Sequence, residues 1–420
     1  MTEHSNIIGG SSAERRINCP GSYKLELPYP NTSSEFAEEG TACHEAMEYI
    51  LLNECPPTEV IGKTFNKGNP HQPEGYVIDD SEDGLYETKI RPAWEAWQEI
   101  IAKYGAIDFV VEARCDLSSV IPGAFGTVDV LGQLERNKKV KVVLDWKFGS
   151  GVSVAAKGNY QCGFYAAAAL HTQGDDDVKD IMKDAELLLF IIVQPDKGEM
   201  QYSEWETPVH WAHMVADLAL AAVNKSERDN APIKPGKHCR WCKAKADCSA
   251  QKDRVDTALS MDPLNTTSVE RAYWLSKADE LSSWVYAIRN AAHEDLTRGV
   301  SIPGYKLVEK RAARKWAGIE ENKLAKLLTK MLGKKKAYKE PELISAPQAE
   351  KELRRQFTAR KEKRGAWKGV FKKELEPYIE KKSSGTTTVA DSDSREAIVN
   401  ISELLGKALD SVKKPDKGLH

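Results

Sequence analysis

The feature that most constrains the fold is an apolar run at 187–194, with the sequence LLLFIIVQ. It reads as a single strand, because it is short and rich in branched and aromatic residues. A strand with no polar face belongs in a sheet that is covered on both sides. The run therefore predicts a central sheet with helices packed on each face.

Other strands are expected before this run, at 108–113, 126–131 and 141–147. A polar turn at 135–138 joins the last two as a hairpin. Helical patterns are expected at four places, namely 34–52 (beginning near Thr41), 81–104, 155–170 and 206–224. This order of elements is typical of a mixed α/β sheet with helices on its faces.

The chain has 420 residues, enough to bury a large core. We expect a compact domain over 1–252, a mostly helical and basic region over 253–382, and a flexible segment with a short helix over 383–420. The second part opens with a long amphipathic helix at 268–298. No apolar stretch approaches the roughly 18 residues that cross a bilayer, and we expect no membrane contact and a cytoplasmic location.

Two carboxylates and a lysine stand where strands are expected to emerge from the core. Asp129 lies in one strand, and Asp145 lies in its hairpin partner, directly after the apolar Val142–Leu144. Lys147 follows two residues later, so its side chain projects from the same face as Asp145. Such a set can hold one or two hard divalent cations. The alternative is that each is a solvated strand residue, although a carboxylate after an apolar run is costly unless it is paired or coordinated.

The residues around this set resemble the successive motifs of one family. They are GTACHEAME at 40–48, GTVD at 126–129, LDWK at 144–147, and the pair Gln161 and Tyr165. Their order and separations resemble those of RecB-like nucleases in the PD-(D/E)XK superfamily. Nearly the whole chain also resembles a phage-borne branch of these nucleases. The resemblance implies an α/β fold with a restriction-endonuclease-like core, a mixed central sheet flanked by helices, and a mostly helical C-terminal extension.

Position by position, the resemblance implies roles for single residues. His44, Asp129 and Asp145 would be ligands of Mg²⁺ or Mn²⁺, helped by the backbone carbonyl of Trp146. Lys147 would activate or position the attacking water. Taken alone, His44 has the alternative of an ordinary histidine on a helix face or in the core.

The same resemblance assigns Gln161 and Tyr165, about one helical turn apart, to bracing the site or touching the DNA backbone. Their alternative is ordinary packing and hydrogen bonding. Glu112 lies on the neighbouring strand and is a further carboxylate, but we leave it outside the predicted set.

Cysteines form a second set. Of the eight, four are scattered and are expected to be isolated core thiols: Cys43, Cys55, Cys115 and Cys162. Cys239, Cys242 and Cys248 have the spacing C-x2-C-x5-C, and Cys19 can supply a fourth thiolate. The arrangement resembles the 4Fe-4S sites of AddB-type and CRISPR-associated RecB-like exonucleases. Zinc is the alternative, because four thiolates also make a closed tetrahedral site.

We expect a metal-dependent DNA exonuclease that serves phage recombination or DNA processing. The net charge of -3 does not exclude a nucleic-acid binder, because the average can hide one basic groove. The stretch at 305–373 is basic with interspersed aromatics, which suits a strand-tracking surface or, alternatively, a solvated helical face. No nucleotide-binding G-x-x-x-x-G-K-[ST] motif is present, so the substrate would be DNA ends or single strands.

Partners follow by analogy: a single-strand-annealing or single-strand-binding protein, and further copies of this chain in a homo-oligomer. Two rival functions stay open. One is a nucleic-acid-binding or assembly module that keeps the fold without catalysis. The other is an endonuclease specific for branched or flapped DNA.

Overall fold

The computed structural model describes most of the first 306 residues and two short pieces beyond them. The described ranges are 7–31, 33–81, 83–149, 153–195, 202–260, 266–306, 353–354 and 366–374. The chain divides into two units, Met1–Glu309 and Lys310–His420. Everything below concerns the first unit, except the helix α14 (Ala366–Glu374) of the second. The predicted segment at 383–420 lies outside the described residues.

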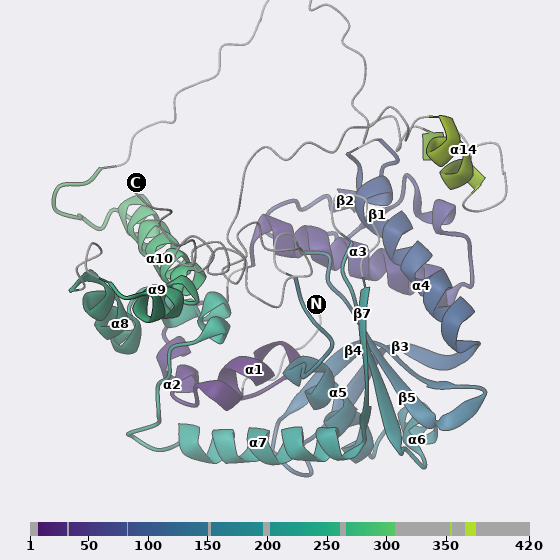
Figure 1. The fold of residues 1–420 in the computed structure, drawn as a ribbon, viewed down its shortest axis with the longest axis horizontal. Helices are drawn as coiled ribbons and strands as arrows, with labels where there is room; N and C mark the ends of the chain where they lie inside the picture. The colour runs from purple at the N-terminus through teal and green to yellow at the C-terminus, as the bar shows by residue number, and fades with distance from the viewer. Residues whose placement is uncertain are drawn as a thin grey trace, which may run out of the picture. The chain divides into compact units, whose positions relative to one another are not determined.

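A five-stranded mixed sheet forms the centre of the first unit, in the order β3-β4-β5-β6-β7 (Figure 1). Only β5 and β6 are parallel, and the other neighbours are antiparallel. The strands are β3 (Ile107–Asp116), β4 (Phe125–Leu134), β5 (Asn137–Trp146), β6 (Leu187–Val193) and β7 (Tyr202–Pro208). The predicted hairpin is confirmed, with a shorter turn than 135–138 because Asn137 and Lys138 already belong to β5, and the strand expected at 187–194 is confirmed as β6.

Side chains of β6 alternate between two hydrophobic cores. Phe190 and Ile192 face one core, which contains helices α1, α5, α6 and α7, while Ile191 and Val193 face the other, which contains α3 and α4. These helices are α1 (Gly10–Asn18), α3 (Glu35–Leu52), α4 (Arg91–Tyr104), α5 (Tyr160–His171), α6 (Asp176–Met182) and α7 (His210–Ser226). The prediction of an α/β sheet buried on both faces is therefore confirmed.

Two predicted helix starts are wrong. The first helix begins at Glu35 rather than near Thr41, because the Ser34 side chain accepts a hydrogen bond from the Ala37 amide and caps the helix there. The helix expected from Ala155 begins at Tyr160, where the Asn159 side chain caps it in the same way. At both helices the N-terminal boundary is set by the capping side chain and not by the pattern of apolar residues.

The helix expected at 206–224 is also corrected. Residues 202–208 form β7 at the edge of the sheet, and α7 begins only at His210. Trp205 packs edge-on against Phe190 of β6, with the ring centroids 5.9 Å apart, and so contributes to the core from the edge strand. Pro208 ends the strand at an edge position, where its missing amide hydrogen is tolerated.

The long helix expected at 268–298 is two helices, α9 (Ser268–Leu275) and α10 (Ala278–Thr297). The stretch at 53–80 is mostly loop, as expected, with a pair of two-residue strands, β1 (Thr64–Phe65) and β2 (Tyr76–Val77). No helix among the described residues is both long enough and apolar enough to cross a membrane.

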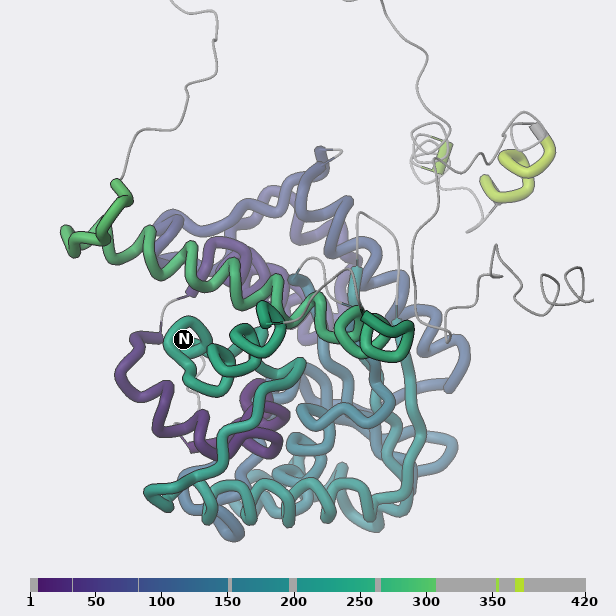
Figure 2. Tube along the Cα trace, turned by 60° about the vertical axis from the view of Figure 1, so that its left-hand side comes forward, coloured from purple at the N-terminus to yellow at the C-terminus, as the bar shows by residue number. Residues whose placement is uncertain are grey.

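The N-terminal segment lies beside a distant part of the chain. Helices α1 and α2 (Ser22–Glu26) contact the short turns η3 (Lys237–Trp241) and η4 (Lys243–Lys245), and α8 (Ser249–Leu259) follows (Figure 2). Because α1 also packs on α5 and α7, one short helix connects this region with the core of the sheet.

Burial on both faces of β6 makes a direct prediction. Ile191→Ala and Ile192→Ala should each lower the free energy of unfolding by about 2–5 kcal/mol, since each leaves a cavity in a different core. Val77→Ala, at a position that is 48% exposed, should cost much less. Urea unfolding followed by circular dichroism measures all three. A negligible cost at either isoleucine would show that the corresponding face is not packed.

Candidate metal centre and cysteine site

Strands β4 and β5 part at the carboxylates that the sequence singled out. Their pairing runs as far as Val130 and Leu144 and ends before Asp129 and Asp145. Beyond that point the Asp129 side chain, rather than the β4 backbone, bonds to β5. Its Oδ2 accepts a hydrogen bond of 2.6 Å from the Trp146 amide. The separation opens a space between the strands with a carboxylate on each side.

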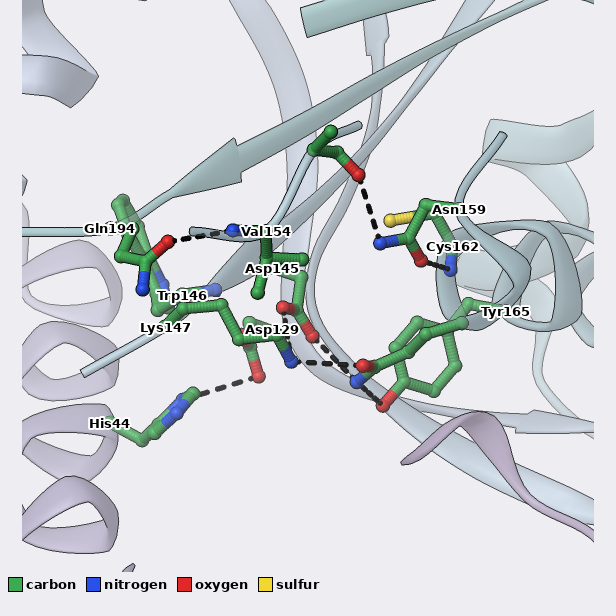
Figure 3. A network of polar contacts seen from close by, with 12 residues as sticks. His44, Asp129, Asp145, Trp146, Lys147, Val154, Asn159, Cys162, Tyr165 and Gln194 are labelled. Carbon is green, nitrogen blue, oxygen red and sulfur yellow. Dashed lines mark hydrogen bonds and ion pairs between the residues drawn. The ribbon is translucent and has the colours of Figure 1, made fainter. Parts of the chain in front are cut away.

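Asp145, Lys147 and Gln161 form one connected group. Lys147 Nζ lies 2.6 Å from Asp145 Oδ2 and donates a hydrogen bond of 2.9 Å to Gln161 Oε1. Gln161 Nε2 donates to Asp145 Oδ1 at 2.8 Å and to the hydroxyl of Tyr165 at 2.9 Å. Helix α5 therefore contacts the strand carboxylate Asp145 through Gln161, and Asp145, Lys147 and Tyr165 lie close together (Figure 3).

His44 approaches from the opposite face of the sheet. It lies on α3, and its Nδ1 is 3.3 Å from Asp129 Oδ1 (Figure 3). The edge of the Phe148 ring packs against the imidazole, with centroids 5.2 Å apart, and fixes the plane of the histidine. The structure thus brings all six predicted site residues together.

Glu112, which lies outside the predicted set, belongs to the same site. Ligand atoms of His44, Glu112 and Asp129 all lie within 4.8 Å of one another, close enough to hold one metal ion. Glu112 has a φ of 47°, a left-handed conformation that is rare for a non-glycine residue. The ladder between β3 and β4 skips Glu112 and Asp129 while pairing the residues on either side. Local strain of this kind is tolerated mainly at functional positions.

Charge is concentrated at this place. Burial and, after it, the nearby Asp129 raise the pKa of Glu112 to about 7. Burial also raises the pKa of Asp145, against the opposing effect of Lys147. For Lys147 burial acts to lower the pKa, but Asp145 outweighs it and the pKa is raised. The lysine is therefore a cation at neutral pH.

The donor set fits a divalent cation of the magnesium or manganese type. Its oxygens come from carboxylates, and a single imidazole nitrogen, that of His44, completes it. Asp145 Oδ2 is buried and, among the described residues, has its ion pair with Lys147 but no hydrogen bond of good geometry. A buried carboxylate that lies among further acidic groups is costly unless a cation neutralises it, and here Lys147 supplies one positive charge.

Two glycines hold the Tyr165 ring in place. A Cβ at Gly10 would lie 2.2 Å from the ring atom Cε1, and a Cβ at Gly126 would lie 2.8 Å from it. Any side chain at these positions would displace the tyrosine, and with it Gln161. Gly126, the first residue of the GTVD motif, therefore has a packing role beside the candidate metal centre. Gly10 places α1 against the same tyrosine ring.

The four predicted cluster cysteines line one cavity. Cys19, which follows α1, faces the same cavity as Cys239, Cys242 and Cys248. Backbone amides point at two of the sulfurs: Lys234 N lies 3.4 Å from Cys19 Sγ, and Gly236 N lies 3.3 Å from Cys239 Sγ. No three cysteine sulfurs of the described residues lie within 4.8 Å of one another.

A buried carboxylate, Glu26, ties the walls of this cavity together. It pairs with Arg15 at 3.1 Å and with Arg16 at 2.9 Å, and its Oε1 accepts a hydrogen bond of 2.9 Å from the Lys243 amide. Arg15 also donates to the carbonyl oxygen of Trp241. The N-terminal helices and the cysteine loop are therefore joined by charged hydrogen bonds as well as by the shared cavity.

Fold and site together define an α/β protein with a candidate divalent-metal centre and a separate four-cysteine cavity. A family described as "Protein of unknown function (DUF2800)" matches residues 4–396, and the chain belongs to this family. Among solved structures, "Crystal structure of SSO0001" is similar at 12% identity, over 60% of this chain and 89% of that one, with a TM-score of 0.27. A likeness of that size carries no argument.

Glu112 gives a test that does not depend on activity. Its ordinary pKa is 4.5 and its pKa in the fold is about 7, so the metal-free protein should lose stability as pH rises between these values. Replacing it as Glu112→Gln should stabilise the protein in EDTA by about 1–3 kcal/mol near pH 8 and by little near pH 5. Urea unfolding at the two pH values measures the difference.

The matched control is Glu135→Gln, which removes an exposed carboxylate from the β4–β5 turn and should change stability by less than about 0.5 kcal/mol. Mn²⁺ should also stabilise the wild type more than Glu112→Gln, because a ligand that binds only the folded state adds to its stability. Equal pH dependence in wild type and variant would show that Glu112 is not held against the other carboxylates.

Proposed function

We propose that this protein is a divalent-metal-dependent DNA nuclease of the RecB-like type. The observation that carries the proposal is the convergence of Asp129, Asp145 and Lys147 at the point where two strands part, with His44 opposite them. The motifs of the resembled nucleases contribute these same residues. A solvated strand residue would not be buried as Asp145 is, with a lysine 2.6 Å away.

His44, Glu112 and Asp129, whose ligand atoms lie within 4.8 Å of one another, would hold Mg²⁺ or Mn²⁺, and Asp145 would be the further ligand that the resemblance implies. When bound, such ions stabilise the attacking and leaving oxygens of a phosphodiester during in-line displacement. The pKa of Lys147 is raised beside Asp145, so its side chain is an ammonium group at neutral pH. Its ammonium group orients a water molecule and offsets the charge that develops on the phosphate.

Gln161 and Tyr165 act as positioning residues. Gln161 contacts Asp145 and Lys147 at once, so it fixes the distance between the carboxylate and the cation. The Tyr165 hydroxyl accepts a hydrogen bond from the Gln161 amide, and its own proton can be donated to a phosphate oxygen. The substitution Gln161→Leu should therefore weaken catalysis without removing a metal ligand.

DNA as the substrate rests on the resemblance, as does the preference for ends. Without a nucleotide-binding loop the chain would act on DNA ends or single strands, in phage recombination or DNA processing. A single-strand-annealing or single-strand-binding protein is the partner that such a reaction calls for, and a homo-oligomer would make digestion processive.

The cysteine cavity fits a 4Fe-4S cluster better than zinc. A tetrahedral zinc site with Zn–S bonds of about 2.3 Å requires sulfurs roughly 3.8 Å apart. No three cysteine sulfurs of the described residues lie within 4.8 Å of one another, so they do not stand at the spacing of a tetrahedral zinc site. Amides directed at Cys19 and Cys239 are the kind of hydrogen bond that tunes cluster thiolates.

The competing function is a binding or assembly module on the same fold. A binding surface does not need a half-buried lysine placed 2.6 Å from a buried carboxylate. Burying such a group has a cost in stability that metal chemistry explains and simple binding does not.

Asp145→Asn should abolish metal-dependent cleavage by at least about a hundredfold while preserving the fold, because the amide keeps the shape but loses the charge that binds the cation. End-labelled single- and double-stranded DNA would be incubated with anaerobically purified protein and Mg²⁺, Mn²⁺ or EDTA. Asp256→Asn, at an exposed site on α8, is the matched control and should cleave normally. No cleavage by the wild type with any substrate would favour the binding module.

Cys19→Ser should remove the cluster, because the other three thiolates cannot complete it. Absorbance near 400 nm, together with iron, sulfide and zinc analysis of anaerobic protein, would measure this, with thermal unfolding as a second readout. Cys55→Ser, a cysteine outside the cavity, should keep the full iron content. One zinc per chain and no iron in the wild type would instead establish the tetrahedral alternative.

A further inference from the structure

The loop that carries three of the cavity cysteines has an exposed surface that the cavity does not use. The turns η3 and η4 carry Lys237, Arg240, Trp241 and Lys243, and all four side chains are exposed. None of them lines the cysteine cavity, whereas Arg15 and Lys245 do. The cations that could offset the charge of a cluster are therefore different from those that face solvent.

Charge on this surface is uncompensated. No aspartate or glutamate occurs between Ile233 and Ala246. Across the described residues, Lys237, Arg240 and Lys243 form no ion pair, whereas Lys103, Lys139 and Lys179 elsewhere on the surface each do. Like charges gathered without a counter-charge repel one another, so the arrangement favours an anionic partner.

Trp241 gives the surface its second property. Its side chain is 65% exposed, while its backbone is held: the carbonyl accepts a hydrogen bond of 3.1 Å from Arg15. The carbonyl of the preceding Arg240 accepts one of 2.8 Å from Lys245. The Arg240 guanidinium lies 5.8 Å from the centre of the indole ring. A large aromatic face is thus presented to solvent on a fixed backbone beside a cation.

We propose that Trp241, Lys237, Arg240 and Lys243 form a docking surface for single-stranded nucleic acid, in which a base stacks on the indole and the cations neutralise the flanking phosphates. This deepens the proposed function and rests on it. Stacking requires an open base face, which a duplex does not offer along its length. An acidic peptide would engage the charges but not a stacking ring.

The position of this surface suits the proposed reaction. Arg15, which holds the Trp241 backbone, lies on α1, and the first residue of that helix packs against Tyr165 of the metal centre. Nine residues of helix span roughly 14 Å. The Trp241 backbone and the Tyr165 ring are therefore both in contact with the same helix.

The test separates stacking from charge. Binding of a labelled oligothymidylate and of an abasic strand of the same length would be measured by fluorescence anisotropy, in the full chain carrying Asp145→Asn so that cleavage does not interfere. Trp241→Ala should weaken oligothymidylate binding roughly 5- to 150-fold and abasic binding much less. Trp241→Tyr should restore most of the loss.

The role of charge is tested by Lys243→Gln. This substitution should weaken the binding of the oligothymidylate and of the abasic strand alike, and it should lower the slope of log affinity against log salt concentration by about one. Lys138→Gln is the matched control. It removes an exposed lysine at the far end of β5, roughly 23 Å from Asp145, and should change neither. Iron content and circular dichroism of each variant would establish that the loop and fold are intact.

Equal weakening of both strands by Trp241→Ala, or no weakening, would overturn the stacking surface. Tighter binding of anionic vesicles than of oligothymidylate, lost in Trp241→Ala, would assign the surface to a membrane instead and would also overturn it. These outcomes are independent of cleavage. If the wild type cleaves DNA and Trp241→Ala binds normally, the docking surface alone is refuted. If the wild type binds through Trp241 but never cleaves, the nuclease function alone is refuted.

Discussion

The separation of β4 from β5 is the constraint on which the candidate metal centre depends. A sheet ladder normally satisfies every amide along neighbouring strands, and here it stops one residue before each carboxylate. The Trp146 amide would be left without a partner, but Asp129 accepts its proton. The Asp129 side chain thus supplies the hydrogen-bond acceptor that the β4 backbone does not, and it also faces the candidate cation site. On its other side, β5 continues to pair with β6 through Trp146, which keeps Asp145 and its neighbours rigid.

Helix α1 connects the two sites. At its first residue, Gly10 packs against Tyr165, and directly after its last residue Cys19 enters the cysteine cavity. Losing the cavity contacts would therefore release the helix that positions the tyrosine. A cluster at this place would stabilise the fold by closing a very long loop, an effect of roughly 3–5 kcal/mol in chain-entropy terms. It would also hold one wall of the metal centre, so a structural cofactor can influence chemistry about 14 Å away without taking part in it.

Much of the fold could be predicted from local sequence, and the failures have physical reasons. Residues 187–193 have no polar face, so their burial was readable from the sequence alone. The β7 strand was missed because an edge strand is only half buried, and Tyr202–Pro208 mixes aromatic with acidic residues. Glu112 was left out because its role depends on a left-handed backbone, which the surrounding residues impose and no motif encodes. The sequence did show a glutamate in an otherwise apolar strand, which was the available signal.

Electrostatics explains why such a site cannot be optimal for stability alone. Three carboxylates, Glu112, Asp129 and Asp145, share the centre with the protonated Lys147 and with His44, so like charges lie close together in a partly dry place. Raising the pKa of Glu112 to about 7 relieves part of this repulsion by keeping a proton there. A divalent cation held by these residues would relieve more of it and would compete with that proton. Fold stability, metal affinity and protonation are therefore linked in one equilibrium, and each must change when either of the others does.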